Sequence, residues 1–166
     1  MKLPWVGLAG WAGLAGWVGT AARLILAAVW ALAGWSKVGD LAASGRTVNA
    51  YRLMPFEAAK IIGAALPFIE LVLAALLLAG LATKLAAAVS GGLLAVYIAG
   101  IASVWARGLS IDCGCFGGGG QLAAGVHPNY FWDIARDVAL LAVAVVLILT
   151  PRTRIAVDNY VLGLED

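Results

Sequence analysis

Long uncharged stretches alternate with short groups of charged residues along most of the chain. No charged side chain lies between Lys84 and Arg107, and Glu70 is the one charge between Lys60 and Lys84. A membrane-spanning helix needs about 20 mostly apolar residues, so both stretches are long enough to cross a bilayer. The pattern predicts an all-α fold, a four-helix transmembrane bundle, with helices at about residues 20–36, 60–83, 85–106 and 131–150.

The first and last of these helices begin in unusual sequence. Residues 1–19 repeat glycine and tryptophan, and we interpret them as an interfacial or poorly ordered lead-in, with an extension of the first helix as the alternative. Residues 131–150 carry Asp133, Arg136 and Asp137 in their first turns, so we expect that end to lie in the headgroup layer. The membrane domain is predicted over residues 20–154, with a cysteine loop at 107–130 and a tail at 155–166.

The composition supports a membrane location. Hydrophobic residues make up 63% of the chain and charged residues 12%, and the mean hydropathy of +0.97 is far above that of soluble domains. We therefore expect a multi-pass integral protein of the cell membrane, with the lipid bilayer as its surroundings. The net charge of +2 is spread over the ends of the hydrophobic segments, so nucleic acid is not an expected partner.

The lysines and arginines do not orient the protein in the membrane. With four spans, both termini share one side with the loop between the second and third helices, and the nearby cations are almost equally divided between the two sides. The same topology places the loop at 36–59 and the cysteine loop together on the opposite side. The chemistry of the cysteines depends on whether that side is the cytoplasm or the extracytoplasmic space.

Both cysteines of the chain lie in one short loop, as Cys113 and Cys115 with Gly114 between them. A disulfide at this separation requires a sharp bend, which glycine permits. Such a bond closes almost no loop and adds little stability, whereas strained, exposed disulfides tend to be labile or catalytic, so the spacing favours a redox pair. The alternatives are inert loop cysteines and a metal site, for which two thiolates suit copper(I) but the spacing matches none of the usual zinc patterns.

The reactivity of this pair depends on its neighbours, because positive charge or a helix N-terminus lowers the pKa of a thiol. The candidate positive groups are Arg107, Arg136 and His127, together with the start of the last helix. Asp112 directly precedes Cys113 and is a candidate proton acceptor in thiol chemistry.

Glu70 lies near the middle of the second predicted helix. A charged group at the bilayer centre costs about 2.5–3.5 kcal/mol on insertion scales, so such residues usually face the bundle interior and mark a functional site. Pro67 comes one turn earlier and frees a backbone carbonyl, which makes Pro67 and Glu70 a candidate site for a small apolar ligand such as a quinone head group. The alternative is a structural glutamic acid, hydrogen-bonded across the bundle to Tyr97 or Ser90.

Three strings of the sequence carry a family resemblance: WALAGWSKVGD at the end of the first helix, LPFIELVLAALLLAGLATK in the second, and IDCGCFG in the cysteine loop. Over residues 20–154 the chain resembles the DoxX/MauE family of redox-associated membrane proteins, and most closely its MauE-like branch with a Cys-x-Cys loop. The resemblance implies a four-helix bundle linked to thiol–disulfide exchange, with Cys113 and Cys115 as the redox pair and Glu70 as the buried acid. It also implies an extracytoplasmic cysteine loop and two cytoplasmic termini.

The function expected from these features is that of a membrane thiol–disulfide oxidoreductase. A thiolate of a thioredoxin-like partner would attack the disulfide between Cys113 and Cys115, and electrons would pass to or from a membrane carrier, for which we expect a quinone, with Glu70 handling protons. This mechanism needs no metal and no covalently bound cofactor. The rival hypothesis is a non-catalytic anchor or assembly subunit of a redox complex, in which the cysteine loop is structural or handles a metal. A proton-coupled transporter is disfavoured because the hydrophobic segments show no inverted repeat.

Overall fold

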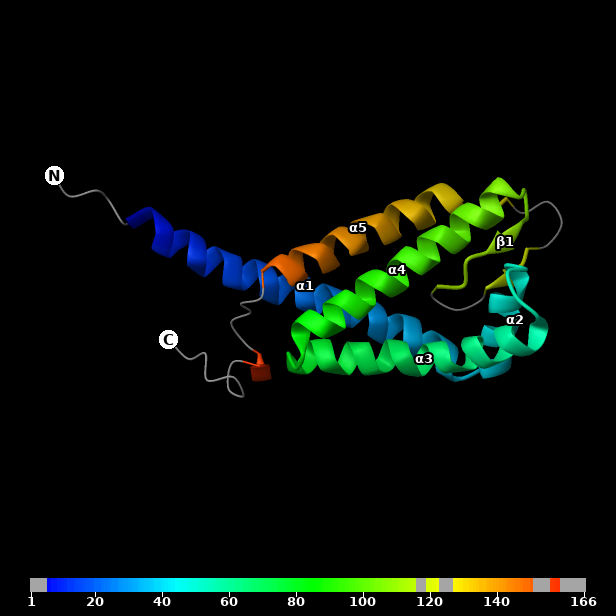
Figure 1. The fold of residues 1–166 in the computed structure, drawn as a ribbon, viewed down its shortest axis with the longest axis horizontal. Helices are drawn as coiled ribbons and strands as arrows, with labels where there is room; N and C mark the ends of the chain where they lie inside the picture. Colours follow the sequence, from blue (N-terminus) through cyan, green and yellow to red (C-terminus); the bar gives the residue numbers. More distant parts are fainter. Residues whose placement is uncertain (1–5, 116–118, 123–126, 151–155, 159–166) are drawn as a thin grey trace.

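A computed structural model of the chain describes residues 6–115, 119–122, 127–150 and 156–158. Within these ranges the fold consists of five helices and one two-stranded antiparallel ribbon (Figure 1). The elements are α1 (Val6–Val38), α2 (Leu41–Ala50), α3 (Phe56–Ala79), α4 (Thr83–Ala106), β1 (Ile111–Asp112), β2 (Gly120–Gln121) and α5 (Tyr130–Leu149). Residues 1–5 of the predicted lead-in, and residues 155 and 159–166 of the predicted tail, lie outside the described ranges.

Three helices in the described part of the chain are long and apolar enough to cross a membrane. They are Gly16–Val38 within α1, Phe56–Ala79 and Thr83–Ala106. Helix α5 has 20 residues, but its first turns carry the three charged residues Asp133, Arg136 and Asp137, so it is not among the candidate spans. The protein is therefore a multi-pass membrane protein, whereas a fourth crossing by α5 stays a prediction.

The first helix is longer than the sequence pattern predicts. It begins at Val6, so residues 6–19, which we interpreted as a lead-in, are part of it. No proline lies between Pro4 and Pro55 to end a helix, and glycine is common in membrane helices. Figure 1 shows that these first turns extend beyond the other helices of the bundle.

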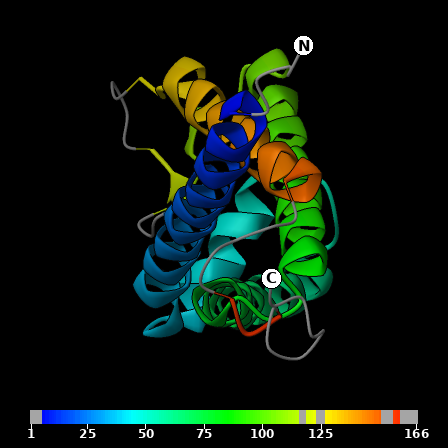
Figure 2. The same cartoon turned by 90° about the vertical axis from the view of Figure 1, so that its left-hand side faces the viewer.

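The long helices pack mainly as two pairs, α1 with α3 and α4 with α5 (Figures 1 and 2). The first pair is tight at Gly34, where an added Cβ would lie 2.7 Å from Leu71 Cγ and 2.9 Å from the carbonyl oxygen of Pro67. Between the pairs, the buried indole N–H of Trp30 in α1 donates to Ser90 Oγ in α4 at 2.9 Å. Small residues and cross-helix hydrogen bonds of this kind are what hold membrane helices together.

Large apolar side chains cover the outside of the bundle rather than only its core. Leu32, Ile61 and Val96 are each more than 60% exposed, on α1, α3 and α4. A soluble protein avoids extended apolar surface of this kind, but lipid is an apolar solvent. The outer surface therefore matches a bilayer, in agreement with the sequence prediction.

A tight turn joins α3 to α4 at the end of the bundle away from the cysteine loop (Figure 1). Gly80 ends α3 with a φ of 66°, and an added Cβ there would lie 2.7 Å from Ala156 Cα, so both conformation and space require glycine. The carboxylate of Asp158 accepts the backbone N–H groups of Ala82 and Thr83 at 2.8 and 2.9 Å. Asp158 thus caps the N-terminus of α4 from a distant part of the chain.

Replacing Asp158 by alanine is expected to destabilise the protein by about 0.5–2 kcal/mol at neutral pH, the usual cost of losing an N-cap. Burial alone would raise the pKa of Asp158, but hydrogen bonds from Thr83 and Ala82 outweigh it and hold the pKa below the ordinary carboxyl value. A lowered folded-state pKa means that this stability is present above the unfolded-state pKa and is lost as the pH falls through the folded-state value. Thermal unfolding in detergent should therefore show a difference between variant and wild type that shrinks toward acid pH. A difference independent of pH would contradict the cap.

The loop predicted at 36–59 contains the short helix α2. Its N-cap is Asp40, whose carboxylate accepts the N–H of Ala43 at 2.8 Å. Helix α2 packs closely on α3, since an added Cβ on Gly63 would lie 2.6 Å from Gly45 Cα and 2.6 Å from the carbonyl oxygen of Ser44. Ten residues of mixed polarity gave no membrane-helix pattern, and packing on α3 is what stabilises them as a helix.

Gly63→Ala is expected to destabilise the protein by about 1–3 kcal/mol, because the new methyl group meets backbone atoms that cannot rotate away. Gly92→Ala on the exposed side of α4 is the matched control, since nothing lies within 4 Å of an added Cβ there. The control should be neutral or more stable by up to about 1 kcal/mol, through its higher helix propensity. Unfolding of both variants in the same detergent gives the comparison. Equal stability of the two would argue against the close α2–α3 contact.

Candidate functional site

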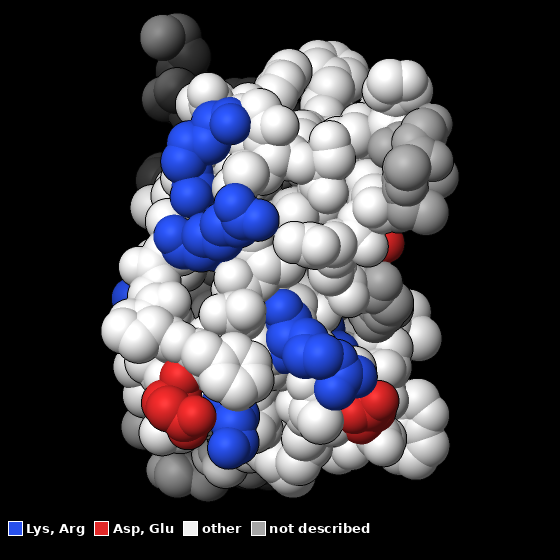
Figure 3. All heavy atoms as spheres, turned by 90° about the vertical axis from the view of Figure 1, so that its right-hand side faces the viewer, with Lys and Arg blue, Asp and Glu red and all other residues white. Residues whose placement is uncertain are grey.

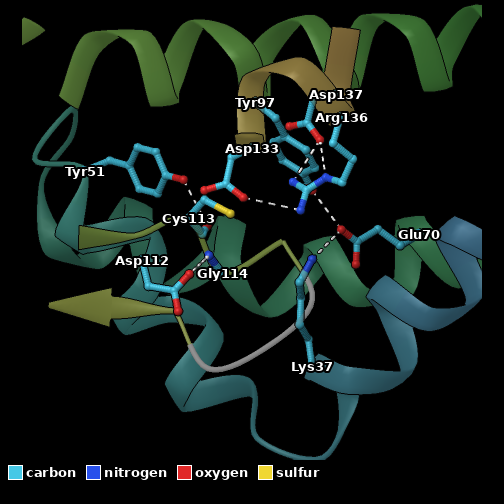
Figure 4. Close-up of polar contacts among 10 residues, drawn as sticks. All are labelled: Lys37, Tyr51, Glu70, Tyr97, Asp112, Cys113, Gly114, Asp133, Arg136 and Asp137. Carbon is cyan, nitrogen blue, oxygen red and sulfur yellow. Dashed lines mark hydrogen bonds and ion pairs between the residues drawn. The ribbon is translucent and has the colours of Figure 1, made fainter. Parts of the chain in front are cut away.

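The cysteine loop is fixed at one end of the bundle by hydrogen bonds to other elements. The hydroxyl of Tyr51, directly after α2, donates to the carbonyl oxygen of Cys113 at 2.9 Å (Figure 4). The hydroxyl of Tyr130, at the start of α5, accepts the N–H of Ile111 in β1 at 2.9 Å. The segment 36–59 and the cysteine loop therefore lie together, as the sequence predicts.

Gly114 makes the bend between the two cysteines. Its φ is 68°, and an added Cβ would lie 2.4 Å from Thr47 Cγ2 on α2, so no other residue fits without strain. Its N–H donates to Asp112 Oδ1 at 3.2 Å. The carboxylate of Asp112, expected as a proton acceptor, thus bonds to the loop backbone, and no hydrogen bond joins it to either sulfur within the described ranges.

The two thiols are free, and each shifts the pKa of the other. Cys113 is buried and Cys115 is half-buried. The hydrogen bond from Cys115 lowers the pKa of Cys113, although burial opposes the shift, and the same bond together with burial raises the pKa of Cys115. Cys113 is thus the thiol whose pKa is the lower of the two, and Cys115 is the less buried residue.

Arg136 is the cation that reaches the cysteine pair. Its guanidinium lies beside Asp133, with Nη1 3.4 Å from Oδ1, and beside Asp137, with Nη2 2.9 Å from Oδ1 (Figure 4). It also forms a hydrogen bond with Cys113, which contributes to the lowered pKa of that thiol. Of the other two candidates from the sequence, Arg107 donates instead to the backbone after α2, and His127 is exposed.

A second polar cluster lies between α1, α3 and α4 (Figure 4). Glu70 is fully buried, and its Oε1 lies 2.6 Å from Lys37 Nζ. The hydroxyl of Tyr97 donates to the same oxygen at 2.8 Å, and Lys37 Nζ stands 5.9 Å from the centre of the Tyr97 ring. The bond to Tyr97 was one of the sequence expectations for Glu70, whereas Ser90 bonds to Trp30 instead.

Lys37 is the residue of this cluster that sequence reasoning missed. It follows the last apolar residues of α1 and was counted only as a cation flanking the membrane. Its position in the sequence could have revealed it. Lys37 follows Trp30 by seven residues, or about two helical turns, so the two side chains lie on the same buried face of α1. An internal acid on another helix then makes a buried lysine partner plausible.

A cavity of about 360 Å³ connects the two clusters. It lies between the C-terminal end of α1, α2, α3, α4 and the cysteine loop, with Lys37, Tyr97, Cys113 and Cys115 in its wall. Most of the remaining wall is apolar and includes Leu53, Met54, Ile62, Leu66, Leu93 and Val96. The cavity thus places a dithiol and a buried ion pair around one apolar space.

The predicted ligand site at Pro67 and Glu70 is only partly at this cavity. Pro67 is buried against Gly34 of α1 and is not one of the lining residues. Glu70 faces the cavity indirectly, through Lys37 and Tyr97, which both line it. A ligand in this space would therefore meet the lysine and the tyrosine before the carboxylate.

The end of the molecule that holds the cysteine loop carries exposed charged side chains of both signs (Figure 3). Two surface ion pairs lie there, Arg46 with Asp40 at 3.6 Å and Lys60 with Glu57 at 3.7 Å. Exposed charges of this density belong in water or among lipid head groups. Within the described ranges no group of three or more His, Cys, Asp or Glu side chains is placed to hold a metal ion.

Comparison with known proteins gives one match. The model of a family described as methylamine utilisation protein MauE matches residues 15–150. No curated protein and no solved structure matches the chain.

Proposed function

The chain belongs to the MauE family, whose model covers most of its length, and from this premise we propose that it is a membrane thiol–disulfide oxidoreductase. The observation that carries the proposal is the geometry of Cys113 and Cys115. Gly114, with a φ of 68°, bends the loop between two free thiols, and both cysteines line one cavity. A bend of this kind is what a disulfide between residues two apart in sequence requires.

The two sulfurs have different roles in the proposed exchange. In the oxidised protein, a thiolate of a partner dithiol attacks Cys115, the accessible sulfur, and breaks the bond to Cys113. Cys113 leaves as a thiolate, next to the Arg136 guanidinium. The second partner thiol then attacks the mixed disulfide and releases Cys115. The partner loses two electrons and two protons as its disulfide forms, and this protein gains the two electrons as a reduced pair.

The partner we propose is a thioredoxin-fold protein. The cysteine loop lies at the charged end of the bundle (Figure 3), which suits access by a water-soluble protein. We place this end outside the cytoplasm and both termini inside it, because stable disulfide chemistry requires an oxidising compartment. The reduced pair then returns its electrons to a carrier in the membrane, for which a quinone is the proposed class.

The proposal is tested by mixing the purified, oxidised protein with a reduced thioredoxin-fold protein. Maleimide gel shift then measures how much of the partner becomes oxidised. We expect up to one partner disulfide for each chain, and none with the Cys113→Ala/Cys115→Ala double variant. A partner that stays reduced with both proteins would support the rival role of a non-catalytic anchor or assembly subunit.

The membrane side is tested on whole cells with a membrane-impermeant maleimide. Labelling of Cys113 and Cys115 only after mild reduction would place them outside the cytoplasm as a disulfide. Thiols that stay unlabelled until the membrane is opened would place the loop in the reducing cytoplasm and contradict the proposed orientation.

A further inference from the structure

We propose that the cavity beside the cysteine pair binds the head group of a lipid-soluble quinone, with Lys37 and Tyr97 facing a ring carbonyl oxygen. The inference deepens the proposed exchange function and, for its electron-transfer step, rests on it. It differs from the site expected at Pro67 and Glu70, because the residues that face the ligand are on α1 and α4. Four observations support it: the size of the cavity, its opening, its polar groups, and the presence of Cys113 and Cys115 in its wall.

The size and wall of the cavity suit a small apolar ring. Its volume of about 360 Å³ falls within the range of roughly 300–1,000 Å³ that is usual for small-molecule sites. The wall is mainly apolar with a few polar groups at one side, which is the general pattern of a site that orients an apolar ligand by its polar end.

The opening of the cavity points to a ligand that arrives through lipid. Ile62 on α3 and Val96 on α4 line the cavity and are also exposed on the outer surface, by 41% and 64%. Figure 1 shows α3 and α4 diverging from their common turn toward this end. The space between them is therefore bordered by apolar side chains of two membrane-spanning helices, and a ligand with a long apolar tail can leave its tail in the bilayer.

The polar groups suit a neutral ligand that accepts hydrogen bonds. The charge of Lys37 is balanced by Glu70 at 2.6 Å, so this ion pair presents no net charge to a ligand. A lysine ammonium has three donor hydrogens, and the contact with Glu70 uses one of them. The Oε2 atom of Glu70 is buried and has no hydrogen-bond partner in the described part of the molecule, which is unusual for a site complete without a ligand or water.

The electron and proton balance closes with this ligand class. When Cys113, as a thiolate, and Cys115, as a thiol, form a disulfide, they lose two electrons and one proton. A quinone takes up two electrons and two protons to become a quinol. The proton from Cys115 supplies one, and Lys37 supplies the other at the carbonyl oxygen. Lys37 then regains a proton from water.

The test uses decylubiquinone as the probe and two tryptophan substitutions on α4. Val96→Trp fills the cavity, whereas Val89→Trp is the matched control, since Val89 is also exposed but does not line the cavity. Binding is measured as a saturable rise in the thermal unfolding temperature of the detergent-solubilised protein. We expect the same apparent affinity in wild type and Val89→Trp, and an affinity weaker by about tenfold or more in Val96→Trp, because the indole occupies the space of the ring.

Tyr97→Phe provides a second variant that keeps the shape of the core. It should weaken decylubiquinone binding and slow its reduction by the dithiol form. Val89→Trp, which lies outside the cavity, should exchange with a reduced thioredoxin-fold protein at the wild-type rate. The absence of saturable stabilisation in wild type, or equal affinity in the two tryptophan variants, would overturn the inference. If decylubiquinone binds but no exchange with the partner occurs, the exchange function is refuted and the quinone site is retained. Failure of the exchange function and failure of the quinone site therefore give different results.

Discussion

A thioredoxin-fold protein that keeps only its attacking cysteine is expected to be trapped by the oxidised protein as a mixed disulfide on Cys115. Cys115 is the less buried residue of the pair, so we expect the incoming thiolate to attack it first. Cys113 is also the better leaving group, because the guanidinium of Arg136 acts on it and stabilises the departing thiolate. Mass spectrometry of the trapped complex identifies the bonded cysteine. A complex found mainly on Cys113 would reverse the assignment.

The same assignment predicts how single substitutions behave. Cys113→Ser and Cys115→Ser should each reduce turnover to the uncatalysed background, because neither variant can form the internal disulfide. Asp112→Asn is the control within the loop, since asparagine keeps an oxygen that accepts the N–H of Gly114. Exchange at the wild-type rate would mean that Asp112 shapes the loop. A strong loss of rate would instead support the proton-acceptor role expected from the sequence.

The pH dependence has a definite sign. For the reduced protein, attack by Cys113 on a small disulfide requires the thiolate. Because the pKa of Cys113 lies below the ordinary thiol value, the rate should reach its plateau at a lower pH than for a free cysteine, whose pKa is about 8.5. It should fall as the pH decreases through the folded-state pKa. If the rate of attack rises only near the pKa of an ordinary thiol, the pKa of Cys113 is not lowered.

Lys37→Met is expected to destabilise the protein by about 3–5 kcal/mol, the usual cost of removing one partner from a buried ion pair. The substitution leaves the carboxylate of Glu70, which is fully buried, with only the hydroxyl of Tyr97 as a donor. The double variant Lys37→Met/Glu70→Gln should recover much of the loss, because no unpaired charge remains. Denaturant or thermal unfolding of the two single variants and the double variant in one detergent gives the coupling energy.

Lys60→Met is the matched control for this experiment. Lys60 is 62% exposed and faces Glu57 across 3.7 Å at the surface, so its loss should change stability by less than about 0.5 kcal/mol. If Lys37→Met were as mild as Lys60→Met, or if the two losses at Lys37 and Glu70 simply added, the pair would not be coupled as the structure describes.

Local pattern was enough to predict several features of this protein. The uncharged stretches indicated the membrane helices, because each must exceed the thickness of the hydrocarbon layer, and three of them are present as apolar helices of sufficient length. The spacing of Cys113 and Cys115 around a glycine indicated a bent pair. The early start of α1 was only the alternative interpretation, and α2 was not predicted, because glycine content and polarity are poor guides where neighbouring helices supply the stabilising contacts.

The sequence by itself determined the membrane class, the family resemblance and the candidate reactive groups, because these depend on composition and on residues close together in the chain. Only the tertiary structure decided which of these groups act on one another. Lys37 and Glu70 are 33 residues apart, and Tyr51 is 62 residues from Cys113. Contacts over such separations arise from how α1, α2, α3 and α4 pack. One example is the close contact between α3 and α2, where Gly63 lies against Gly45. That packing created one apolar cavity between the ion pair and the dithiol, for which no local pattern provides a signal.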